Sequence, residues 1–270
     1  MKRLFIVFLL SSFSFIISSA SDTIRVLCIG NSFSQDAVEQ ELAPICESGN
    51  QPIIIGNLYF GGCSLKKHWS FLEQDRAAYK FRYIKNGVKE EFADYSLVQA
   101  LLLHQWDYIS FQQASPDSGI KSSYEPYLSQ LIDTVRHYQA DATLCWMHTW
   151  SYSKDSKHRA FPIYHNDQQL MTDSIHAAML AVLEHHPELQ LIPCGRAIQL
   201  ARQTKLGDTL CRDGYHLNKS YGRYTVACVW YEFLTGKNCR CITYKHADMT
   251  PQQKRLSQLS AHQANKEKKN

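Results

Sequence analysis

The stretch Thr-Ile-Arg-Val-Leu-Cys-Ile-Gly-Asn-Ser, residues 23–32, joins a short apolar run to a polar turn. Residues 24–29 are mostly aliphatic and partly β-branched, which is typical of a buried strand in a parallel sheet. Residues 35–47 follow with apolar residues at helical spacing, although Pro44 interrupts them. We therefore predict that the strand ends at Gly30 and that Ser32 lies on a strand-to-helix turn. Backbone N–H groups on such a turn point outward and favour a developing negative charge.

The rest of the chain alternates between strand and helix patterns. We predict strands at residues 24–29, 52–58, 107–112, 142–148 and 189–192, and helices at 35–47, 66–82, 95–104, 122–139, 165–186, 196–204 and 219–235. Five strands separated by helices imply an α/β fold with a doubly wound parallel sheet and a site at the carboxyl ends of the strands. Asn86-Gly87 is a hairpin signal and predicts a small insertion over the sheet.

A second motif, Asp213-Gly214-Tyr215-His216, lies near the other end of the chain. A serine becomes a good nucleophile when a base takes its proton and a carboxylate orients that base. Ser32, His216 and Asp213 fit these roles. Both motifs also have a structural interpretation, because Asn and Ser cap helices and Asp-Gly forms turns. Their order and the strand before Ser32 favour catalysis.

With these motifs, the chain resembles the SGNH (GDSL-like) hydrolase superfamily over residues 24 to about 235. Residues 29–34, 61–65 and 211–217 are similar to a branch of secreted bacterial proteins whose function is unassigned. The resemblance implies a three-layer α/β/α, flavodoxin-like fold with a five-stranded parallel sheet. It also implies ester hydrolysis, without naming the substrate.

The superfamily holds the oxyanion with donors from three motifs, and the resemblance carries over unevenly. It implies the N–H groups of Ser32 and Gly62, although two glycines at 61–62 also suit an ordinary loop. The usual Gly-x-Asn-Asp motif is absent, and Gln-Gln-Ala-Ser stands at 112–115 instead. That segment resembles the Gln-Gly-Glu-Ser of sialate and carbohydrate acetylesterases, which implies the Gln112 amide as third donor, with Gln113 as the alternative.

Aromatic and polar side chains follow the predicted strand 142–148, among them Trp146, His148 and Trp150. Such rings could stack on a sugar, or they could pack against a helix layer. We take Asn31, Gln113 and Trp150 as candidate substrate contacts. His148 is a weaker candidate base than His216, because it has no carboxylate at useful spacing.

Length and composition favour one large core, since the chain has 270 residues and is 44% hydrophobic. Lys2 and Arg3, an apolar run and Ser18-Ser19-Ala20 predict a signal peptide at residues 1–20, with a retained anchor as the alternative. The hydrolase-like domain would span 21–245, and a C-terminal helix and basic tail 246–270. We expect a secreted or periplasmic protein without stable membrane insertion after cleavage.

The formal charge is +4, and removal of Lys2 and Arg3 lowers it to +2, too little to indicate nucleic-acid binding. An odd count of nine cysteines leaves at least one thiol unpaired in an exported protein. We expect Cys28 and Cys145 in buried strands. A Cys194–Cys211 bridge is one possible pairing. No cysteine pair has Cys-x-x-Cys spacing, and Cys239-Arg240-Cys241 is too close for a zinc knuckle, so neither a metal nor another cofactor is predicted.

These patterns lead to a serine esterase that removes an acetyl or other short acyl group from a carbohydrate or another small ester. The missing third motif keeps an alternative open, a catalytically inactive carbohydrate-binding or interaction protein with the same fold. Acyl transfer to a sugar acceptor would use the same three residues in a drier site. The sequence does not indicate an oligomeric state.

Overall fold

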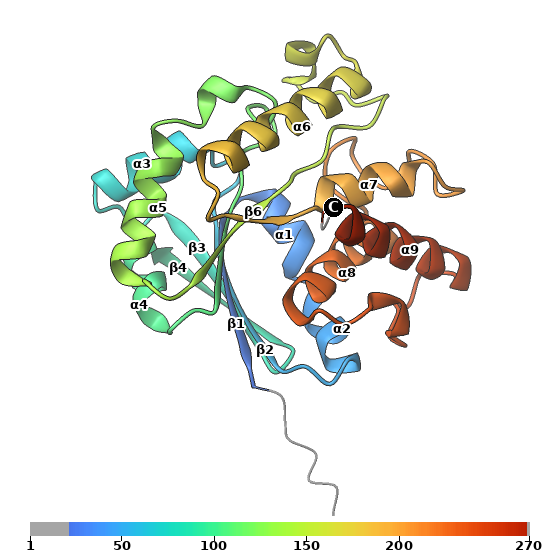
Figure 1. Ribbon diagram of the computed structural model, residues 1–270, viewed down its shortest axis with the longest axis horizontal. Helices are drawn as coiled ribbons and strands as arrows, with labels where there is room; N and C mark the ends of the chain where they lie inside the picture. Colours follow the sequence, from blue (N-terminus) through green and yellow to red (C-terminus); the bar gives the residue numbers. More distant parts are fainter. Residues whose placement is uncertain (1–21, 269–270) are drawn as a thin grey trace, which may run out of the picture.

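The computed structural model describes residues 22–268, and its centre is a seven-stranded sheet (Figure 1). The parallel strands, in spatial order, are β2 (Ile53–Tyr59), β1 (Ile24–Gly30), β5 (Tyr108–Phe111), β6 (Thr143–Met147) and β7 (Gln190–Ile192). This is the flavodoxin-like order. The predicted parallel sheet of five strands is confirmed, and two further strands extend it.

The added strands, β3 (Tyr79–Lys85) and β4 (Val88–Tyr95), form an antiparallel hairpin that pairs with β2. Asn86 and Gly87 both have positive φ, as a tight hairpin turn requires. The predicted hairpin is confirmed, but it widens the sheet instead of lying over it. The predicted helix 66–82 was too long, because residues 79–85 form a strand that pairs with β2 on one side and β4 on the other.

The helices lie on both faces of the sheet. One face carries α1 (Ser32–Val38), α2 (Leu42–Ser48), α7 (Cys194–Arg202), α8 (Tyr221–Thr235) and α9 (Pro251–Glu267), and the other carries α3 (Leu65–Glu73), α4 (Leu97–Leu103), α5 (Tyr127–Tyr138) and α6 (Gln168–His185). Short 3₁₀ turns occupy Lys121–Ser123, Phe161–Tyr164 and Cys239–Cys241. The three-layer α/β/α arrangement is confirmed.

Strand β1 separates two hydrophobic cores. Val26 and Cys28 point to the α8 side, whereas Leu27 and Ile29 point to the α5 side. All four side chains are buried, as the continuous apolar run predicts. The predicted helix 35–47 is broken into α1 and α2. Pro44 falls in the first turn of α2, where its missing N–H costs no hydrogen bond.

The C-terminal helix α9 is part of this fold. It packs against α7 and α8, and its Ala261 and Ala264 are buried in the same core as Val26. The predicted signal peptide, residues 1–20, lies outside the described residues. Among residues 22–268, no helix combines the length and the apolar character that a membrane span needs.

Candidate active site

Ser32 lies at the predicted turn, as the first residue of α1. Asn31 caps the helix, and its Oδ1 accepts the Phe33 N–H at 3.0 Å. Its Nδ2 donates to the Cys63 carbonyl at 2.9 Å and lies 3.4 Å from the Gln113 carbonyl. Asn31 therefore joins the turns after β1, β2 and β5. Ser32 itself is half-buried, and its hydroxyl has no hydrogen bond among residues 22–268.

Gly30 makes this turn possible. A Cβ atom at residue 30 would come within 2.2 Å of the Ser34 hydroxyl and 2.7 Å of the Gln112 side-chain amide. Ser34 cannot move away easily, since its hydroxyl bonds to Asn31 O and Asn57 Oδ1, both at 2.9 Å. Only glycine fits between the strand and the start of α1.

The second motif forms a compact histidine–carboxylate pair. His216 Nδ1 lies 2.7 Å from Asp213 Oδ2, and Asp213 Oδ1 accepts the His216 backbone N–H at 2.8 Å. Burial alone would raise the pKa of Asp213, but the hydrogen bonds from His216 outweigh it and hold that pKa below its usual value. Asp213 is therefore ionised at neutral pH. In the described structure, no hydrogen bond occupies His216 Nε2, which leaves it available to a substrate or to Ser32.

Asp36 connects the two motifs, and the sequence patterns did not single it out. It lies one helical turn after Ser32 and is 1% exposed. Its Oδ2 accepts the backbone N–H of Leu217, next to His216, at 2.7 Å. Its Oδ1 accepts from Arg223 Nε at 2.9 Å, and Arg212 lies 3.4 Å away. The helix that begins with Ser32 is thus bonded directly to the loop that carries His216.

The candidate oxyanion donors differ in accessibility. Gly62 lies on the exposed loop between β2 and α3 with φ +64°, and a Cβ there would meet nothing within 4 Å. Gln112 and Gln113 are fully buried. Gln112 Oε1 accepts the backbone N–H groups of Ser34 at 2.9 Å and Asn31 at 3.2 Å. Gln113 Oε1 accepts the Leu65 and Ala114 N–H groups. Both amides are engaged within the protein.

The aromatic residues after β6 are mainly core residues. Trp150 is 1% exposed, donates its indole N–H to the Tyr215 carbonyl at 2.9 Å and packs edge-on against Phe33. It has no exposed face for a sugar and instead supports the His216 loop. Half-buried Tyr215 lies beside His216, with the two ring centres 4.0 Å apart. Half-buried His158 lies next to Tyr215, with ring centres 4.6 Å apart.

His148 is a core histidine. It is 7% exposed, and burial lowers its pKa to about 3. It is therefore neutral at physiological pH and enclosed, unlike His216. Trp146, two residues earlier, is also buried.

The cysteines form no disulfide among the described residues, and all nine are free thiols. The possible Cys194–Cys211 bridge is therefore wrong. Cys28 and Cys145 are buried in strands as predicted, and burial raises the pKa of Cys28 to about 12. These two thiols pack as small apolar side chains.

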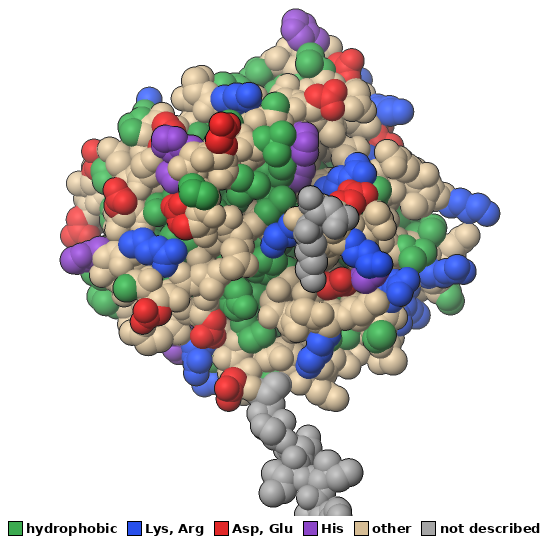
Figure 2. All heavy atoms as spheres, viewed as in Figure 1, with side chains coloured by type: hydrophobic (Ala, Val, Ile, Leu, Met, Phe, Trp, Pro, Cys, Tyr) green, Lys and Arg blue, Asp and Glu red, His purple; other side chains and the backbone are tan. Residues whose placement is uncertain are grey.

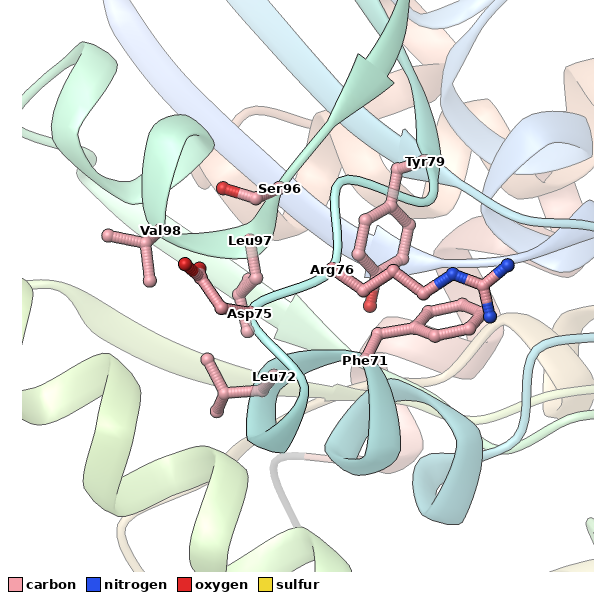
Figure 3. A pocket seen from close by; sticks show the side chains of 8 residues that line it. All are labelled: Phe71, Leu72, Asp75, Arg76, Tyr79, Ser96, Leu97 and Val98. Atoms are coloured by element: carbon pink, nitrogen blue, oxygen red, sulfur yellow. The ribbon is translucent and has the colours of Figure 1, made fainter.

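A small hollow of about 190 Å³, part of it open to solvent, lies between α3, β3 and α4 (Figure 3). Its walls include Phe71, Tyr79 and Leu97, with Asp75 at its rim, and none of the candidate site residues. On the face drawn in Figure 2, basic and acidic side chains are interspersed, which matches the small net charge.

Comparisons with known proteins identify the family and the fold of this chain. The model of the family described as "Domain of unknown function (DUF4886)" matches residues 25–264. The crystal structure of a DUF4886 family protein from Bacteroides uniformis ATCC 8492 is 41% identical, with a TM-score of 0.88 over 90% of this chain and 95% of that one. The search of curated proteins found no match.

More distant structures share the fold. A proposed SGNH hydrolase from Slackia heliotrinireducens is 16% identical, with a TM-score of 0.55 over 79% of this chain and 100% of that one. A proposed GDSL-like lipase from Parabacteroides merdae ATCC 43184 is 13% identical, with a TM-score of 0.53 over 79% of this chain and 95% of that one. Because the family match spans the sheet and includes Ser32, Asp213 and His216, this chain, with its SGNH hydrolase fold, belongs to the DUF4886 family.

Proposed function

We propose that this protein is a secreted or periplasmic serine esterase that removes an acetyl or other short acyl group from a carbohydrate. The observation that carries the proposal is the 2.7 Å Asp213–His216 pair, tied through Asp36 to the helix that begins with Ser32. A structural turn needs neither an ionised carboxylate on Nδ1 nor an open Nε2, whereas a general base needs both.

The reaction would proceed through an acyl-enzyme. Ser32 Oγ attacks the acyl carbon while His216 Nε2 takes the hydroxyl proton, and Asp213 stabilises the imidazolium. The tetrahedral intermediate collapses, the ester C–O bond breaks, and His216 gives its proton to the departing sugar oxygen. Water then attacks the acyl carbon, loses a proton to His216 and releases the carboxylic acid as Ser32 regains its hydrogen.

The oxyanion would be held by the backbone N–H groups of Ser32 and Gly62. The third donor expected from the motif resemblance, Gln112, is buried and directs its side-chain oxygen to the backbone N–H groups of Ser34 and Asn31. In this proposal Gln112 therefore shapes the turn. Loss of a single oxyanion donor costs about 10²–10³-fold in kcat in other enzymes, so we expect a slow esterase.

The carbohydrate part of the proposal rests on the rings beside His216. Tyr215 is half-buried and lies beside His216, the proposed general base. In this position its ring could contact the flat face of a sugar. Asn31, Gln113 and Trp150 are buried and would support the site from behind. An acylated carbohydrate is therefore preferred to a long-chain lipid ester.

The buried glutamines also favour the second candidate, a binding protein that has the fold without the catalysis. Covalent chemistry at Ser32 separates the two. We expect a fluorophosphonate probe to label the wild type at Ser32, and an acetyl ester to be hydrolysed. Ser32→Ala should abolish both, and His216→Gln should reduce both by at least about 10³-fold because the base is lost.

Peptide mapping by mass spectrometry provides the internal control. Ser34 lies two residues away but is buried, with its hydroxyl already bonded to Asn57, so it should stay unlabelled. A folded wild type that neither reacts with the probe nor hydrolyses acetylated sugars would refute the esterase and leave the binding protein.

A further inference from the structure

A second cluster of chemically active side chains lies away from Ser32, where the end of α6 meets the start of α5 (Figure 1). His185 is the last residue of α6, and His186 caps that helix. Glu125 stands two residues before α5 begins. The fold brings Glu125 to His186 across 61 positions of sequence, so no short motif indicates this cluster.

The ligand atoms of Glu125, His185 and His186 all lie within 4.8 Å of one another. Zn²⁺ binds nitrogen and oxygen at about 2.0–2.2 Å, which places neighbouring atoms of a tetrahedral site about 3.3 Å apart. One pair, His186 Nε2 and Glu125 Oε1, is 2.7 Å apart. The other separations are at most 4.8 Å, so small adjustments of exposed His185 and half-buried Glu125 would bring all three ligand atoms to the spacing that zinc requires.

The surroundings of the cluster resemble those of a metal centre. Glu125 Oε2 accepts the Ser129 hydroxyl at 2.6 Å, which aims Oε1 at His186. The other ring nitrogen of His186, Nδ1, lies 3.5 Å from Glu188 Oε1. Metal-binding histidines usually have a carboxylate or carbonyl on the second nitrogen, because it fixes the ring and raises its basicity.

We propose that Glu125, His185 and His186 bind one divalent transition-metal ion, with Zn²⁺ as the best match. Two imidazoles and a carboxylate suit zinc and its neighbours better than Mg²⁺ or Ca²⁺, which prefer oxygen ligands. His186 is buried while His185 is exposed, so water can occupy the fourth position. The bound ion would clamp the end of α6 to the start of α5. This site is independent of the esterase proposal.

The test is calorimetric titration of untagged, metal-free full-length protein with Zn²⁺ at pH 7.5. We expect one ion per chain and a rise in thermal stability. His185→Ala removes an exposed ligand without disturbing the core, and Glu125→Gln keeps the side-chain shape. Each should weaken this binding about tenfold or more. His137 is an exposed histidine on α5 outside the cluster, so His137→Ala should leave the zinc affinity unchanged.

Zinc binding at an exposed thiol or at the proposed active site must be separated from binding at the cluster. Cys241 is an exposed thiol, so all proteins carry Cys241→Ser. His216→Gln removes the histidine of the proposed active site and should leave the titration unchanged. Co²⁺ substitution reports the ligand type, because thiolate ligation adds a charge-transfer band that imidazole and carboxylate do not. Absence of zinc binding by the parent protein, which carries only Cys241→Ser, would overturn the proposal. Zinc binding that survives both His185→Ala and Glu125→Gln would overturn it as well.

Discussion

Asp36 is a buried carboxylate on which the geometry of the candidate active site depends. It accepts hydrogen bonds from Leu217 and Arg223, which lie in the loop and helix that follow His216. Two arginines and one carboxylate share this buried region, with Arg212 at the more exposed side. Removal of the negative charge would leave a buried cation without its partner, which is costly.

We predict that Asp36→Asn lowers the free energy of unfolding by about 3 kcal/mol, because a buried ion pair is broken from one side. If the esterase proposal holds, kcat should fall more than KM rises, since the neutral amide would release the loop that positions His216. Urea unfolding and steady-state kinetics on an acetyl ester measure the two effects.

A matched control is the partly exposed pair of Arg196 and Glu267, whose side chains are 43% and 36% exposed. Glu267→Gln should cost less than about 1 kcal/mol, because water screens this pair. Equal losses for Asp36→Asn and Glu267→Gln would show that Asp36 is not a structural link.

At the scale of elements, the burial of α8 depends on its packing against α9. Helix α8 is buried on nearly all sides, as in a helix within a core. One side of α8 faces the sheet and α2, while α9 covers another. Small buried residues of α9, Ala261 and Ala264, allow the two helices to approach closely. Helix α9 therefore forms part of the hydrophobic core.

We predict that Ala261→Leu destabilises the protein by about 1–3 kcal/mol, because the larger side chain has no room between α8 and α9. Gln263→Leu adds an apolar side chain of the same size on the exposed side of α9 and should change stability by less than about 0.5 kcal/mol. Chemical denaturation of both variants checks this. An unchanged free energy of unfolding for Ala261→Leu would mean that α9 packs loosely against α8.

At the scale of the whole molecule, buried histidines make stability depend on pH. Burial lowers the pKa of both His68 and His148 to about 3. An unfolded histidine titrates near 6.5, so between these values the unfolded chain binds more protons than the folded one. Stability contributed by the neutral imidazoles is therefore fully present above about pH 6.5 and is lost as pH falls toward 3.

We predict that each of these histidines removes about 2 kcal/mol of stability between pH 7 and pH 5. His148→Gln should therefore lose about 2 kcal/mol less than the wild type over that interval, whatever its stability at pH 7. Exposed His137→Gln should follow the wild-type curve. Urea unfolding at a series of pH values gives the comparison, and parallel curves for His148→Gln and wild type would contradict it.

Local patterns in the chain were sufficient to predict most of the strands and helices and the contact between Asp213 and His216. The apolar run before Gly30 predicted β1, and Asn86-Gly87 predicted the hairpin turn, because strand burial and turn geometry depend on neighbouring residues. The Asp213–His216 contact also lies within reach of sequence reasoning, since the two residues are three positions apart. The alternating order of strands and helices then implied the doubly wound sheet.

Contacts between distant residues were decided only by the tertiary structure. Asp36 meets Leu217 across 181 positions, Gln112 turns its amide toward Asn31, and Glu125 meets His186. The hairpin widens the sheet because β3 pairs with β2, and no local pattern specifies that pairing. Sequence periodicity reports which face of an element is apolar, whereas the partner of a buried polar group depends on how whole elements pack.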